Sequence, residues 1–69
     1  MTATEAQTVF QLVHPANPRR YVFRIMPDCR VLVDLMHDER IVNVWNKSTI
    51  EARLFWRFLI HRGWVRLND

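Results

Sequence analysis

Four stretches of the chain alternate in the manner of β-strands, with apolar residues on both sides of the alternation, whereas only one later stretch is helical in character. Successive side chains of a strand point to opposite faces of a sheet, so one helix can cover only one of the two faces. A chain of 69 residues with this pattern is therefore expected to leave a half-apolar sheet face uncovered. Exposed apolar patches of this kind are typical of interaction sites.

The four predicted strands cover residues 8–14, 20–26, 30–36 and 41–45. Residues 15–18 separate the first two, because their two prolines cannot donate to a strand ladder and Asn17 suits a turn. Residues 27–29 and the pair Asp38-Glu39 form the next two turns. Links this short join antiparallel neighbours, so we predict a four-stranded meander.

The lengths of these turns predict how the strands pair. Register matters because a slip of one residue moves every side chain of a strand to the other face. The predicted pairs are Leu12 with Tyr21, Phe23 with Val33, Tyr21 with Leu35, Met36 with Ile41, Leu35 with Val42 and Val33 with Val44. The face predicted to form the core collects Phe10, Leu12, Tyr21, Phe23, Ile25, Val31, Val33, Leu35, Val42 and Val44.

The opposite face is predicted to hold more apolar than polar side chains. Its members are Val9, Gln11, Val13, Arg20, Val22, Arg24, Met26, Arg30, Leu32, Asp34, Met36, Ile41, Asn43 and Trp45. Tryptophan and arginine are frequent binding anchors, so we predict that this face binds a protein partner or a second copy of the chain around Trp45, Arg24 and Leu32. The predicted contact also includes Val22, Met36 and Ile41. The alternative is that β-branched residues merely suit half-exposed strands and that the C-terminal residues cover part of the face.

A single helix is predicted to follow the strands. Ser48-Thr49-Ile50-Glu51 has the pattern of a capping box, and Gly63 suits the left-handed end of a helix. One apolar stripe of this helix is core-facing in its spacing and consists of Ala52, Phe55, Trp56 and Leu59; a second stripe consists of Ile50, Leu54 and Phe58. We expect both stripes to pack within the domain, with residues 64–67 over the flank or added as a short fifth strand. The alternative is that one stripe meets a second chain.

A row of basic residues on the same helix raises a nucleic-acid alternative. Arg53, Arg57 and His61 recur at intervals of four, and the net charge of the chain is +3. With Arg24 these residues are candidate phosphate contacts for RNA or DNA. RNA-binding sheets place two or three aromatic side chains centrally for base stacking, whereas the predicted open face has only Trp45. Protein binding is therefore the favoured prediction.

Size and composition limit the remaining function classes. We predict one α+β domain over residues 8–69, preceded by a loose tail at residues 1–7. A single cysteine, Cys29, favours a reducing compartment and hence the cytoplasm. The three histidines lack the spacing of metal ligands, and a single glycine, Gly63, cannot form a glycine-rich phosphate loop. No metal, cofactor, small-molecule ligand or enzyme activity is therefore predicted. No apolar run is long enough to span a membrane. A small regulator, adaptor or accessory subunit is the expected role.

Overall fold

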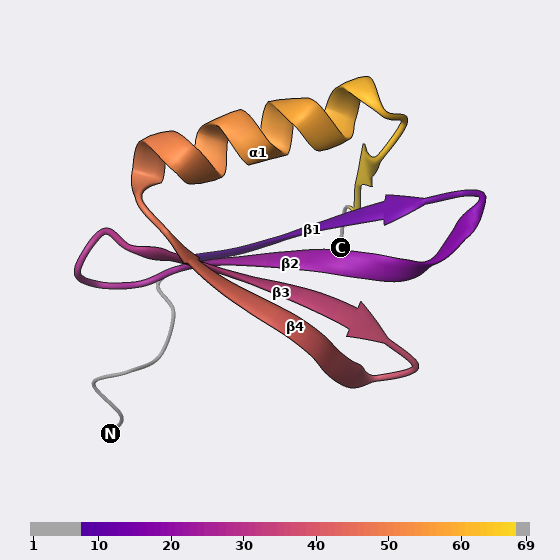
Figure 1. The fold of residues 1–69 in the computed structure, drawn as a ribbon, viewed down its shortest axis with the longest axis horizontal. Coiled ribbons are helices and arrows are strands. Elements are labelled where there is room, and N and C mark those ends of the chain that lie inside the picture. The colour runs from indigo at the N-terminus through magenta and orange to yellow at the C-terminus, as the bar shows by residue number, and fades with distance from the viewer. Residues whose placement is uncertain (1–7, 68–69) are drawn as a thin grey trace.

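The computed structural model describes residues 8–67 and consists of one antiparallel sheet with a helix lying across one of its faces (Figure 1). Its elements are β1 (Thr8–His14), β2 (Asn17–Ile25), β3 (Val31–His37), β4 (Arg40–Lys47), α1 (Thr49–His61) and β5 (Val65–Arg66). The strand order is β4-β3-β2-β1-β5. This arrangement confirms the predicted α+β meander with a C-terminal helix and a short fifth strand. The tail predicted at residues 1–7 lies outside the described residues.

The pairing of the first three strands follows the predicted register. Leu12 lies opposite Tyr21, and Phe23 lies opposite Val33. Strand β2 begins earlier than predicted, at Asn17, because His14 pairs with that residue across a register shift. The link between β1 and β2 is therefore only Pro15-Ala16.

The pairing of β3 with β4 departs from the prediction after its first step. Met36 lies opposite Ile41 as expected, but a bulge follows and Val33 then lies opposite Trp45. Val42 is the extra residue that the bulge places in β4. The predicted pairing of Val33 with Val44 is therefore wrong, because one inserted residue turns the rest of the strand over.

The core lies between α1 and the sheet face that the helix covers. Its buried apolar side chains are Leu12, Phe23, Val31, Val33, Ala52 and Leu59. Trp45 is half-buried against this core, with ring centroids 6.2 Å from Tyr21 and 5.8 Å from Phe55. The bulge in β4 thus turns Trp45 toward the helix, away from the face on which we predicted it.

Both ends of α1 follow the sequence prediction. The Ser48 hydroxyl accepts from the Glu51 amide at 3.2 Å, and the Ser48 amide donates to the Glu51 carboxylate at 2.9 Å. At the other end Gly63 has a φ of 94°, in the left-handed region, which favours glycine. This glycine turns the chain so that Trp64 packs against Tyr21 at 4.8 Å and β5 pairs with β1.

The second apolar stripe of the helix is not packed within the described part of the domain. Ile50, Leu54 and Phe58 are 74%, 60% and 50% exposed. The expectation that both stripes pack within the domain is therefore wrong. Of the two courses predicted for residues 64–67, the structure shows the fifth strand, which extends the sheet beside β1. We call Ile50, Leu54 and Phe58 the helix outer stripe.

Candidate interaction surface

No described element covers the sheet face opposite α1, as Figure 1 shows. The strand pairings place its side chains in rows that run across the strands. We call it the open sheet face; its members on the strands are Val9, Gln11, Val13, Arg20, Val22, Arg24, Leu32, Asp34, Met36, Ile41, Val44, Asn46 and Val65. Leu67 lies beside Gln11 and joins the row of Gln11, because the Leu67 amide donates to the Gln11 carbonyl at 2.9 Å.

An ion pair occupies the centre of the open sheet face. Arg24 Nη2 donates to Asp34 Oδ1 at 3.0 Å, and Arg24 Nε lies 2.8 Å from Oδ2 in an electrostatic contact without hydrogen-bond alignment. Asp34 is only 4% exposed although no element covers this face. Both carboxylate oxygens are engaged, as a buried carboxylate requires. The Arg24 guanidinium is thus paired with Asp34 within the domain.

A second ion pair lies toward the β3–β4 turn. Arg20 donates to both Glu39 oxygens, at 2.9 and 3.2 Å. The hydrogen bond from Arg20 lowers the pKa of Glu39, and the same bond raises the pKa of Arg20. The two cations and two anions of Arg20, Glu39, Arg24 and Asp34 are therefore mutually neutralised.

Apolar side chains flank this neutral centre on both sides. On the β4 side Ile41 is 56% exposed and Val44 is 46% exposed. On the other side the exposed apolar side chains are Val9, Val65 and Leu67. Between them Val22, Leu32 and Met36 are half-buried. The open sheet face thus has apolar flanks around charged groups that are paired with each other, which lowers the cost of excluding water from it.

The structure brings together five of the six residues predicted as the contact. Val22, Arg24, Leu32, Met36 and Ile41 share the open sheet face. Trp45, the predicted anchor, lies on the other face, so its predicted place at the centre is wrong. Met26 and Arg30 lie outside the strands, in the β2–β3 turn, where Arg30 Nε donates to Asn46 at 2.9 Å.

Sequence reasoning missed three exposed apolar members of this face. Simple alternation places Val44 in the core because residues 41–45 carry no sign of the bulge, and it places neither Val65 nor Leu67 on a face. The alternating pattern of residues 64–67 is the only available signal for the last two, because alternate residues of a strand share one side. A bulge has no comparable signal in this stretch.

The edge strand β4 is poorly suited to pairing with another strand. Its bulge at Val42 interrupts the regular edge, and the Val44 amide donates to the Asn43 side chain at 2.9 Å. Bulges and charged ends are common ways to protect a sheet edge, and here Arg40 and Lys47 end the strand. The β4 edge is therefore less available for contacts than the open sheet face.

The predicted basic row on α1 is divided in the structure. Arg57 and His61 are exposed, and Arg53 is exposed but also lines a pocket between α1 and the sheet. Arg62, at the end of the helix, stacks on the Phe58 ring at 4.7 Å. The three side chains of the predicted row thus do not share one environment, and Arg24 lies on the opposite side of the sheet.

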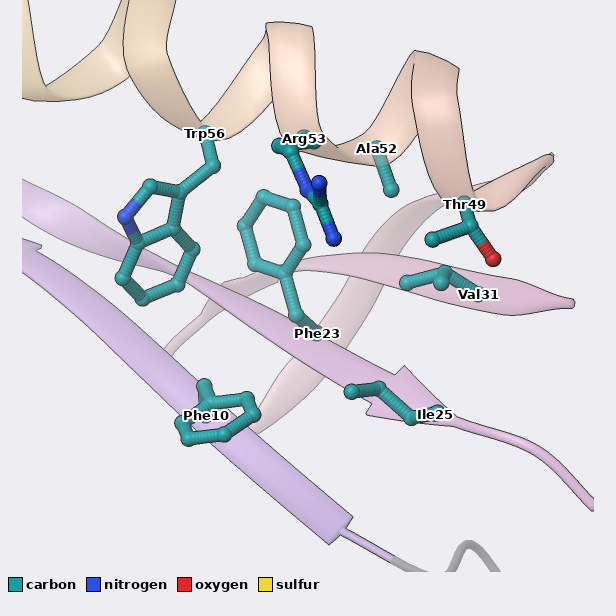
Figure 2. Close-up of a pocket in the computed structure, with 8 residues that line it drawn as sticks. All are labelled: Phe10, Phe23, Ile25, Val31, Thr49, Ala52, Arg53 and Trp56. Carbon is teal, nitrogen blue, oxygen red and sulfur yellow. The ribbon is translucent and has the colours of Figure 1, made fainter. Parts of the chain in front are cut away.

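A pocket lies on the helix side of the sheet. It has a volume of about 170 Å³ and lies between the first half of α1 and the sheet (Figure 2). Its lining residues are Phe10, Phe23, Ile25, Val31, Thr49, Ala52, Arg53 and Trp56. In Figure 2 the Arg53 side chain extends from the helix toward the sheet. We call this hollow the aromatic pocket.

Residues 8–67 contain no group of three histidine, cysteine, aspartate or glutamate side chains arranged to hold a metal ion. Cys29 is exposed in the β2–β3 turn. No helix within these residues has the length and apolar character that crossing a membrane requires. In comparison with known proteins, no family model, no curated protein and no solved structure matches the chain.

Proposed function

We propose that this chain is a small non-enzymatic interaction module, acting as a regulator, adaptor or accessory subunit, that binds a protein surface through its open sheet face. The observation that carries the proposal is the combination of apolar flanks with a centre in which Arg24 and Asp34 already neutralise each other. Such a face loses apolar contact with water when a partner covers it and leaves no buried charge unpaired. The partner is a different protein or a second copy.

The size of the face suits a weak or transient contact. Four strands about 4.8 Å apart and seven to nine residues long span roughly 500 Å². A partner of matching size would bury about 1,000 Å² in total, which is the lower limit for a specific interface. We therefore expect an association that depends on concentration and is reversible.

Two observations weigh against the nucleic-acid alternative. With Trp45 turned toward the helix, the open sheet face offers no aromatic side chain among its described members for base stacking. Arg24 is engaged with Asp34 and Arg20 with Glu39, so neither guanidinium is free of a competing carboxylate. The cytoplasmic location remains part of the proposal and rests on the single cysteine.

The proposal is tested with a pair of matched substitutions. Val44→Lys places a charge on the open sheet face, and Leu54→Lys makes the same kind of change on the helix outer stripe. Both positions are exposed, so both variants are expected to fold, which circular dichroism checks. Sedimentation velocity over a wide concentration range first measures self-association of the wild type and both variants.

If the wild type is monomeric, affinity capture from nuclease-treated lysate at high salt follows with the same three proteins. We expect Val44→Lys to lose the association, or the captured protein, and Leu54→Lys to retain it. Loss in Leu54→Lys with retention in Val44→Lys would transfer the site to the helix. Binding that disappears at high salt and depends on nucleic acid would favour the alternative.

A further inference from the structure

The aromatic pocket has a volume sufficient for one aromatic ring. Its volume is about 170 Å³, and an engineered apolar cavity of about 150 Å³ in another protein binds benzene. Phe10 comes from β1, Phe23 and Ile25 from β2, and Ala52 and Trp56 from α1 (Figure 2). The walls are thus apolar side chains supplied by both layers of the domain.

The aromatic walls favour a ring as the occupant. The Trp56 ring stands nearly perpendicular to Phe23, with centroids 5.0 Å apart, and to Phe10, with centroids 6.1 Å apart. Edge-to-face contacts of this kind are the preferred geometry of aromatic pairs. A further ring in the pocket would add to a cluster that already has this geometry.

Two polar side chains line the pocket, and only Arg53 has hydrogen-bond donors left over. The Thr49 hydroxyl donates to the Cys29 carbonyl at 2.9 Å. Within residues 8–67 the Arg53 guanidinium makes no hydrogen bond or ion pair with a side chain or carbonyl. Arg53 is exposed, so its cation lies where the pocket meets solvent.

Within residues 8–67 Arg53 also forms no ion pair with the acidic residue of its own helix. Glu51 is the acidic residue of the first turn, and its carboxylate is occupied by the Ser48 amide at 2.9 Å. Guanidinium groups match the geometry of carboxylates and bond to them with two parallel hydrogen bonds. The chemistry of the pocket is therefore an apolar aromatic interior with a cation at its rim.

We propose that the aromatic pocket binds a small aromatic carboxylate, with the ring among Phe23, Trp56 and Phe10 and the carboxylate paired with Arg53. This site lies on the helix side of the sheet, whereas the open sheet face is on the other side. Ligand binding in the aromatic pocket is therefore independent of the proposed protein interaction, and each can be tested without the other.

The test uses benzoate as the probe and benzyl alcohol as its neutral counterpart. Amide and indole resonances of the full chain are followed by NMR while each probe is added at neutral pH. Arg53→Gln removes the cation at the pocket. Arg57→Gln makes the same change in charge one turn further along the helix, outside the lining, and is the matched control.

We expect benzoate to shift the resonances of Phe23, Ile25 and Trp56 in a saturable way. Arg53→Gln should weaken benzoate binding about fivefold, as suits a partly solvated arginine–carboxylate pair, while Arg57→Gln should change it less than about twofold. Benzyl alcohol should bind the three proteins equally. The proposal is overturned if no saturable shift occurs at these residues, or if Arg53→Gln and Arg57→Gln bind benzoate equally well.

Discussion

The register of β4 makes a sharp prediction, because it assigns opposite environments to two adjacent residues. Trp45 is half-buried and contacts the rings of Tyr21 and Phe55. Val44 is 46% exposed on the open sheet face. Substituting each residue separately by alanine therefore tests the bulge at Val42. Without that bulge, Val44 would lie in the core and Trp45 on the open face.

The expected magnitudes follow from these environments. A fully buried tryptophan costs about 3–5 kcal/mol when replaced by alanine, and the partial exposure of Trp45 reduces this to about 2–3 kcal/mol. Val44→Ala removes two methyl groups from an exposed strand position and should cost at most about 1 kcal/mol. Since a domain of this size has a stability near 5 kcal/mol, Trp45→Ala should remove about half of the free energy of unfolding.

Urea unfolding measures both values. Far-ultraviolet circular dichroism is the suitable signal, since removing a tryptophan changes the fluorescence directly. The slope of the free energy with urea should be the same in both variants, which shows that the comparison concerns the folded state. A larger loss of stability in Val44→Ala than in Trp45→Ala would refute the bulged register and restore the simple pairing of Val33 with Val44.

Two further predictions concern charged groups. Asp34→Ala leaves Arg24 without its partner and should lower the free energy of unfolding by about 2 kcal/mol, less than for a fully buried pair because Arg24 is partly exposed. The double variant Arg24→Met/Asp34→Leu should recover most of this stability in urea unfolding. A double variant as unstable as Asp34→Ala would contradict the reasoning. The hydrogen bond from the Ser48 amide lowers the pKa of Glu51, so its stabilising effect is present above about pH 4.5 and is lost as the pH falls through the lowered pKa. The stability difference between wild type and Glu51→Gln should therefore shrink below that pH in thermal unfolding, and a constant difference down to pH 3 would count against the capping contact.

Much of the fold was predictable because local signals and turn lengths agree. Residues 27–29 form a turn in which the Met26 amide donates to the Arg30 carbonyl at 2.9 Å, as the register of β2 with β3 requires. The capping box at Ser48 and the left-handed Gly63 likewise depend only on neighbours in the sequence. Contacts between residues close in the sequence depend on only a few residues and can be predicted from them.

The errors arise where packing between distant residues decides. A simple register and a bulged register both satisfy the turn at Asp38-Glu39, and the bulge buries Trp45 beside Tyr21 and Phe55 in exchange for exposing Val44. Apolar area favours the larger side chain in the core. The aromatic pocket was not predictable either, since its lining combines β1, β2, β3 and α1, and no short segment carries its pattern.

The distribution of charge bears on which apolar surface a partner would use. The helix outer stripe lies on the element that carries Arg53 and Arg57, with Arg62 stacked on Phe58. Two copies meeting through their helices would bring these cations together, and like charges that lose water are unfavourable. On the open sheet face, by contrast, Arg20 and Arg24 each face a carboxylate within their own chain. The sheet face can therefore meet an apolar surface of either a second copy or another protein without added repulsion, whereas the helix requires an acidic partner.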